Sequence, residues 1–179
     1  MAVEEKLIEM QQGKNKILLF RRLADQTVDN AIKLVFQTEH TFSYSRSLDK
    51  IVTKDGAVIK VGELESEVSI EAIQAKGDVL ADMLRGSVIK GEKLELWEVT
   101  VDEDLKEGDK YPAIYCQGYL ESWETPASVE DEATISTTFQ IEMEPQFGMA
   151  TLTAEQQEAV QYAFRDTIAA GIEEAGAEG

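Results

Sequence analysis

The chain has almost no cysteine or histidine: its 179 residues contain one of each, Cys116 and His40. A single cysteine excludes an intramolecular disulfide, and its place in an apolar alternating run indicates core packing. The spacing of zinc ligands is also absent. A lone histidine in an alternating strand is typical of a packing or surface residue, and only composition would pair His40 with Cys116 as base and nucleophile.

Basic residues are scarce as well. The chain has 17 Lys and Arg against 35 Asp and Glu, which gives a formal net charge of -18. Such a net charge argues against a phosphate-neutralising surface for tight nucleic-acid binding. Passing contact with DNA is still compatible with this charge, because a repulsive wall touches a polyanion without retaining it.

Other signatures are missing too. No apolar stretch reaches 18 residues, and the first 16 residues carry early glutamates, so we expect neither membrane insertion by this chain nor a signal peptide. No glycine-rich loop with a phosphate-binding lysine occurs. The acidic segment 102–109 does not match the ligand positions of a helix-loop-helix calcium loop. We therefore expect no cofactor, no metal site and no enzymatic activity.

What is present is alternation of apolar and polar residues with the strand period of two. It runs through residues 30–45, 93–101, 113–125 and 133–144, and the apolar run 14–24 favours a buried strand. Two helices are also expected, one capped by Asp78 and one starting with a capping box at Thr153 and Gln156. A mainly β (α+β) domain is therefore predicted.

Residues 46–62 differ from the core-like strands because they are basic and polar. Asp55-Gly56 lies between two β-rich stretches, and this dipeptide is a strong hairpin signal because both turn positions favour positive φ. The segment is predicted to be a projecting hairpin. Its basic residues stand out in an acidic chain: Arg46, Lys50, Lys54 and Lys60.

The segment that follows carries a row of carboxylates. As an extended strand, it places Glu63, Glu65, Glu67 and Glu71 on one face, with apolar residues and Ser66 on the other. Neighbouring charges about 7 Å apart repel by about 0.6 kcal/mol in bulk water. The face is either a solvated outer surface or a surface that repels another anion.

Three aromatic residues, Tyr115, Tyr119 and Trp123, share one face of the strand predicted at 113–125. Such a face could stack on bases or sugars, but no basic residues accompany it. Packing in the core or at a subunit interface is the better interpretation.

Several stretches together resemble the major tail proteins, or tail tube proteins, of long-tailed bacteriophages with non-contractile tails. The similarity is collinear over residues 13–167 and is carried by "GKNKILLFRRL", "LVFQTEHTFSYSR", "TKDG", "AIQAKGD", "LELWEV", "YCQGYLESWE", "ISTTFQIE" and "GMATLTAEQQEAVQYAFRDT". The resemblance implies a β-sandwich or barrel-like virion subunit, with a packed helix, an extended hairpin and terminal arms. Such subunits form hexameric rings that stack around a tape-measure protein, and the tube later delivers the genome.

We divide the chain into an N-terminal arm (1–12), a tube domain (13–168) and a flexible C-terminal tail (169–179), and the roles of the arm and the tail, which lie outside the resemblance, stay open. The resemblance implies assembly in the host cytoplasm, with tail terminator and tail-tip proteins as further partners and transient passage of double-stranded DNA. We hypothesise that Glu63, Glu65, Glu67 and Glu71 line the channel and that the hairpin bridges subunits or rings. The alternatives are an outward glutamate face that serves solubility and a solvated hairpin. Competing functions are a tube subunit of a contractile or phage-derived injection device, and a carbohydrate-binding or carbohydrate-active protein.

Overall fold

The computed structural model describes residues 10–160. The predicted tail 169–179, the helix beyond residue 160 and residues 1–9 of the predicted N-terminal arm lie outside the described residues. The strands are β1 (Lys16–Arg22), β2 (Ile32–Lys33), β3 (Gln37–Thr53), β4 (Gly56–Ile73), β5 (Leu94–Thr100), β6 (Lys110–Glu124) and β7 (Thr134–Thr151). The helices are α1 (Val79–Lys90) and α2 (Ala154–Val160), with short 3-10 turns at Gly13–Asn15, Leu23–Asp25 and Glu103–Leu105.

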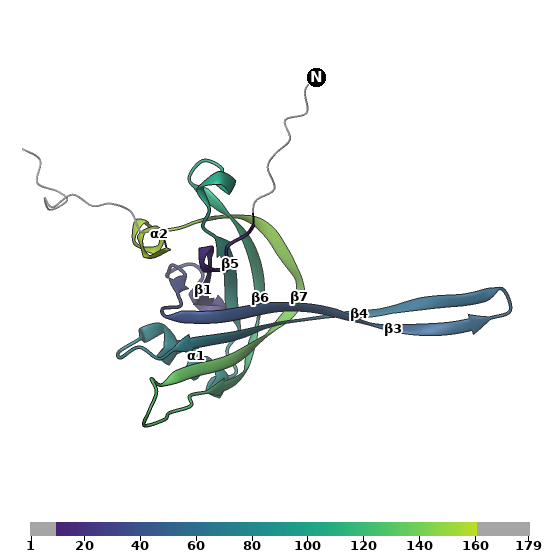
Figure 1. Cartoon of the computed structure of the whole chain (residues 1–179), viewed down its shortest axis with the longest axis horizontal. Helices are drawn as coiled ribbons and strands as arrows, with labels where there is room; N and C mark the ends of the chain where they lie inside the picture. The colour runs from purple at the N-terminus through teal and green to yellow at the C-terminus, as the bar shows by residue number, and fades with distance from the viewer. Residues whose placement is uncertain (1–9, 161–179) are drawn as a thin grey trace, which may run out of the picture.

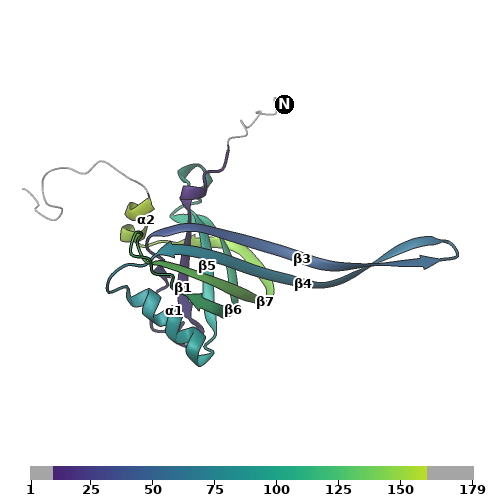
Figure 2. The ribbon, with the colours of Figure 1, turned by 60° about the horizontal axis from the view of Figure 1, so that its bottom comes forward.

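The seven strands form one antiparallel sheet in the order β2-β1-β5-β6-β7-β4-β3. The sheet is curved, and α1 packs below it in the view of Figure 2. Just after β2, the Leu34 amide donates a hydrogen bond to the Leu18 carbonyl of β1 at 2.9 Å, which extends the contact between the two strands. The prediction of a mainly β, barrel-like fold with two helices is confirmed, although a single curved sheet takes the place of a two-sheet sandwich.

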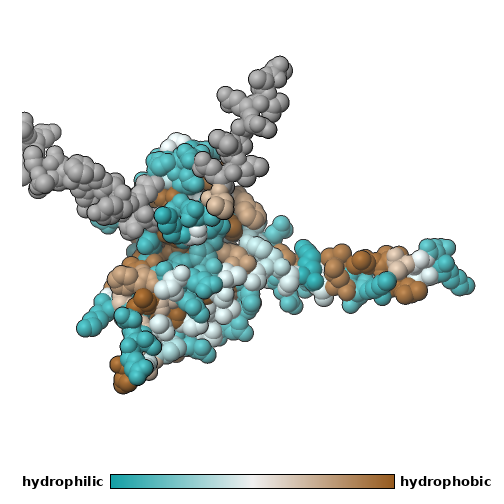
Figure 3. All heavy atoms as spheres, viewed as in Figure 1, coloured by the Kyte–Doolittle hydropathy of each residue, from teal (hydrophilic) through white to brown (hydrophobic). Residues whose placement is uncertain are grey.

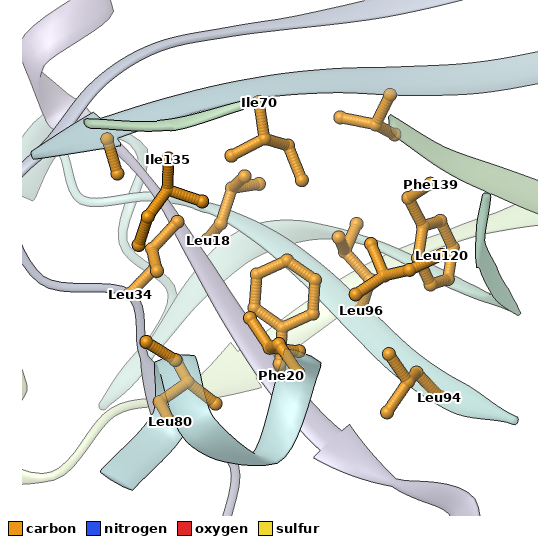
Figure 4. Close-up of a cluster of buried hydrophobic side chains, with 14 of the residues drawn as sticks. Leu18, Phe20, Leu34, Ile70, Leu80, Leu94, Leu96, Leu120, Ile135 and Phe139 are labelled. Atoms are coloured by element: carbon orange, nitrogen blue, oxygen red, sulfur yellow. The ribbon is translucent and has the colours of Figure 1, made fainter. Parts of the chain in front are cut away.

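The main core lies between the sheet and α1 (Figure 4). Alternate residues of the strands meet the helix there, with Phe20 and Phe139 in edge contact at 6.4 Å between ring centres. The helix starts where predicted, because the Asp78 side chain accepts a hydrogen bond from the Leu80 amide at 3.0 Å. It ends at Gly91, whose φ of 68° is the left-handed conformation typical of a helix C-terminus.

A second core cluster covers the opposite side of β1, so this strand is buried on both faces. Its fully buried Tyr111 donates its hydroxyl hydrogen to Glu103 at 2.8 Å. The predicted capping box at the start of α2 is confirmed: Gln156 N–H donates to Thr153 Oγ1 and Thr153 N–H donates to Gln156 Oε1. Gln156 Nε2 also donates to the Ala31 carbonyl at 3.0 Å, which holds α2 beside the upper end of the sheet (Figure 1).

Of the two arrangements expected for residues 30–45, one long strand or a pair of strands, the structure has the pair, because the chain turns between β2 and β3 at Phe36, whose φ is 49°. Two local predictions are corrected. The hairpin turn consists of Lys54 and Asp55, since Thr53 pairs with Gly56. Gly56, at φ 126°, thus follows the turn, and Asp55 does not have the positive φ that the Asp-Gly signal predicts.

The second correction concerns the aromatic face of β6. A β-bulge between Leu120 and Ser122 shifts the side-chain alternation by one residue, so Trp123 packs against the main core. Tyr119 is exposed and Tyr115 contacts Trp97 on another part of the sheet, 5.1 Å between ring centres. The predicted packing of Cys116 in the core is confirmed.

Candidate assembly surfaces

The structure places the four predicted glutamates on the exposed face of β4. From residue 64 to residue 72 the even positions are half-buried or buried, whereas Glu63, Glu65, Glu67 and Glu71 are exposed. The alternation follows from the sheet: one face of β4 packs on the main core, so every second side chain must point away from it. We refer to these four residues as the glutamate face.

The neighbours of the glutamate face add no positive charge. The cross-strand partners of residues 65–71 on this face are serine, threonine, Gln140 and a further carboxylate, Glu39, directly opposite Glu71. Gln140 Nε2 donates to Glu67 at 2.9 Å and to Glu121 on β6 at 2.8 Å. Since like charges opposite one another are destabilising, this concentration of carboxylates is a cost that packing does not explain.

The second surface is the hairpin, residues 46–62. β4 pairs with β7 only from Glu67 to Ile73, so residues 56–66 of β4 have β3 as their sole paired strand. Beyond that point the two strands leave the sheet as a long ribbon (Figure 1). Arg46 closes its base by donating to the Gly62 carbonyl at 2.9 Å. Lys50, Lys54 and Lys60 form no ion pair with any residue in the range 10–160.

One side of the hairpin is aliphatic apart from Lys50. In the β3–β4 register Leu48 lies opposite Val61, Lys50 opposite Ile59 and Val52 opposite Ala57. The large apolar side chains of this side are exposed by 58–81%, and apolar residues follow the ribbon in Figure 3. A lone two-stranded ribbon is marginally stable in water and cannot bury such residues itself. This aliphatic side is therefore incomplete in the single chain.

The third surface is the outer edge of β3. β3 ends the strand order, and its backbone groups on that side have no strand partner within the described sheet. At the other end, β2 is only two residues long. Natural proteins usually cover or interrupt a long free edge because it pairs readily with another chain. A 17-residue edge strand is thus a ready site for association.

A buried polar cluster holds the start of β3 against the sheet. His40 Nε2 lies 2.5 Å from Glu98 Oε2, and Lys16 Nζ lies 3.2 Å from Glu98 Oε1. Gln37 joins His40 Nδ1 to the Leu18 amide, which donates to Gln37 Oε1 at 3.3 Å. Burial would raise the pKa of Glu98, but the hydrogen bond with His40 and the charge of Lys16 hold that pKa below its usual value.

Sequence reasoning found His40 but missed its partners. In "LELWEV" the alternation places Glu95 and Glu98 on opposite faces, and both are buried because β5 is covered on both faces. Glu95 is paired with Arg21 at 2.7 Å and accepts from the Tyr115 hydroxyl at 2.7 Å. The hydrogen-bonding groups of these side chains are satisfied by one another, so they stabilise the fold and do not form a reaction centre.

Nothing in the described part of the chain assembles a reactive or metal-binding site. Within residues 10–160, no group of three or more His, Cys, Asp and Glu side chains is arranged to hold a metal ion. Burial raises the pKa of the Cys116 thiol to about 12, which keeps it protonated and unreactive. Neither described helix has the length and apolar character needed to cross a bilayer. The surfaces above are suited to association between chains.

Comparisons with known proteins agree with this conclusion. Residues 10–147 match the family model described as phage tail tube protein. A putative tail protein of Staphylococcus phage phiMR25 is 31% identical over 169 residues, covering 92% of this chain and 86% of that protein. The tail tube protein gp17.1* of Bacillus phage SPP1 is 26% identical over 129 residues; the match covers 72% of this chain and 48% of that protein.

Solved structures share the fold. The SPP1 tail tube subunit superposes with a TM-score of 0.73 at 20% identity, covering 87% of this chain and 91% of that one. A subunit from the tail of an empty gene transfer agent particle, solved with C6 symmetry, gives a TM-score of 0.60 at 13% identity. That match covers 78% of this chain and 99% of the other.

Proposed function

Because the chain belongs to the phage tail tube protein family and is a structural subunit of a phage tail, not an enzyme, we propose that six copies close into a ring and that rings stack into the tube. The hairpin is the observation that carries this proposal. It is a ribbon that a single chain extends into solvent with an aliphatic side, unpaired lysines and no packing partner among residues 10–160.

Closure of the ring uses the free edges of the sheet. The unpaired backbone groups along the edge of β3 can hydrogen-bond to a neighbouring copy. In a closed ring every copy has such a neighbour, so no edge strand remains unpaired. Six curved sheets joined in this way enclose a wide barrel. The C6 symmetry of the structurally similar gene transfer agent tail supports six copies.

In such a barrel the glutamate face lines the lumen. The side of β4 opposite the glutamates packs on the main core, so the glutamate face remains available to the channel. Sixfold repetition of Glu63, Glu65, Glu67 and Glu71 makes the bore electronegative. Double-stranded DNA then passes without tight binding, because its phosphates meet no cations to hold them.

The lumen assignment is tested with particles that carry Glu65→Lys and Glu67→Lys. We expect tubes to assemble and genome ejection to slow, because lysines attract the passing phosphates. Glu107→Lys and Asp109→Lys, which reverse two exposed carboxylates outside the glutamate face, form the matched control. Unchanged ejection kinetics in the lumen variant would place the glutamates on the outer wall, where they serve solubility.

The role of the hairpin is tested by deleting residues 48–59 and joining Ser47 to Lys60 through a short turn. The main core contains none of these residues, so the variant should fold with a near-native thermal midpoint. Electron microscopy should then show monomers or single rings in place of long tubes. Long tubes of normal appearance would refute the bridging role.

The tube that we propose also has protein partners inside it and at its two ends. A tape-measure protein occupies the lumen during assembly in the host cytoplasm, and tail terminator and tail-tip proteins bind the two ends. Each of these proteins must complement a ring face or the bore described above, and co-purification with tubes tests each in turn.

A further inference from the structure

The hairpin projects from one end of the molecule, and an acidic loop lies at the other. Residues 125–133, here called the β6–β7 loop, connect β6 to β7. The loop adjoins the far end of β4, because the Gln74 amide donates to the Ala133 carbonyl at 2.8 Å. β4 has 18 residues, so the hairpin turn lies about 60 Å from this end along the strand. Figures 1 and 2 both show the ribbon and the loop at opposite ends.

The two ends have opposite charge. The hairpin carries Arg46, Lys50, Lys54 and Lys60 against Asp49 and Asp55, a net charge of +2. The β6–β7 loop carries three carboxylates in succession, Glu130, Asp131 and Glu132, and no basic residue. All three residues are exposed, and none of them forms an ion pair within residues 10–160.

The two ends are also complementary in apolar character. Val129, next to the three acids, is fully exposed. The aliphatic side of the hairpin, described above, also carries Lys50. Burial of Val129 between the aliphatic residues of another copy would remove apolar surface from water on both sides.

The other acidic loop of the chain fits less well. Two of the five carboxylates in the segment 102–109 are already engaged: Asp102 accepts from the Asp104 amide at 3.0 Å, and Glu103 binds Tyr111 and Lys106. The segment also contains Lys106 and is followed by Lys110. It connects β5 to β6 and lies at the side of the molecule, away from the end opposite the ribbon (Figure 1).

We propose that the hairpin of one copy docks on the β6–β7 loop of a second copy, with the aliphatic side covering Val129 and Lys50, which lies on that side, facing Glu130 to Glu132. Lys60 lies on the opposite face of the ribbon and adds positive charge to the same end. The contact joins unlike surfaces at opposite ends of the subunit, so it is head-to-tail and repeats without limit along an axis. It therefore sets the stacking direction of the rings. This inference rests on the proposed function, since it names the surface that receives the hairpin in the tube.

The test is a charge exchange measured as the critical concentration for tube formation. Lys50→Glu with Lys60→Glu, and separately Glu130→Lys with Glu132→Lys, should each raise that concentration about tenfold or more, because like charges then face one another. The variant with all four changes should return to within about threefold of the unaltered chain, since the attraction is restored with reversed sign.

Matched controls separate this contact from general charge effects. Lys90→Glu with Lys110→Glu changes net charge as the hairpin variant does, and should leave assembly unchanged. Glu107→Lys with Asp109→Lys should not rescue the hairpin variant. Equal thermal midpoints of all the monomers show that folding is intact.

Two results overturn the inference while the proposed function stands: tubes form normally from the loop variant, or the fourfold variant assembles no better than the hairpin variant. In either case the hairpin binds another surface. If the unaltered chain forms no tubes at all, the proposed function fails and the inference fails with it.

Discussion

The aliphatic side of the hairpin allows a quantitative prediction. Val52 is 81% exposed and Ile59 is 61% exposed in the single chain. Full burial of such a side chain contributes about 1.5–3 kcal/mol. Scaled by the exposed fractions, replacement of both residues by serine removes about 2–4 kcal/mol of association free energy per subunit. Since 1.4 kcal/mol is a factor of ten, each contact should weaken by roughly 30- to 1,000-fold.

The assay is sedimentation of tubes across a concentration series of the Val52→Ser, Ile59→Ser variant, with negative-stain microscopy of the pellets. Val79→Ser with Ile89→Ser is the matched control, because these residues on α1 are 72% and 78% exposed and lie outside the hairpin. The control should assemble like the unaltered chain. An equal critical concentration for the hairpin variant would refute the reasoning, because it would show that the aliphatic side stays in water.

Two further predictions concern the single chain. Glu98 has a lowered pKa in the folded state, so its ionised form stabilises the fold above its unfolded-state pKa of about 4.5, and this contribution is lost as pH falls through the folded-state pKa. The difference in thermal midpoint between the unaltered chain and Glu98→Gln should therefore shrink between neutral pH and about pH 3, and a constant difference would contradict this. Cys116 is buried with a pKa of about 12, so iodoacetamide at about pH 8 should modify it only after the chain unfolds. Mass spectrometry measures the modification, and rapid modification of the folded chain would show that the core opens.

The features that could be predicted from the sequence are those that depend on local period and local capping. The alternation of β4 is readable because one face is buried and the other is not, so the glutamates mark the outer face without reference to any other strand. The caps at Asp78 and Thr153 are readable because the capping groups lie within three residues of the amides they bind.

The features that could not be predicted depend on residues far away in the chain. Glu98 shares a strand face with the core residues Leu94 and Leu96, but its partner His40 is 58 positions away in the chain, so their pairing is not readable from local pattern. Trp123 lies on the core face of β6 because β6 has one extra residue opposite β7 between Leu120 and Ser122. No residue type in the sequence indicates this bulge. Likewise, the unpaired aliphatic side of the hairpin becomes visible only once the β3–β4 register is known.

A second bulge explains why the hairpin has an aliphatic side at all. Arg46 pairs with Leu64, but Leu48 pairs with Val61, so β4 has one extra residue between these pairs. The extra residue moves the odd positions of β4 to the side that its even positions occupy in the core. Val61 and Ile59 thereby join Leu48 and Val52, whereas the unshifted register would have placed Gly62 opposite Leu48 and Val58 opposite Val52.

Gly62 makes this bulge possible. A Cβ atom at residue 62 would lie 2.0 Å from Ser47 Oγ and 3.0 Å from the Ser47 carbonyl oxygen, so the two strands could not approach as they do. The same strand pair therefore performs two tasks with one change of register. Below the bulge it directs apolar residues into the subunit's own core, and above the bulge it directs them outward to a surface that only another subunit can cover.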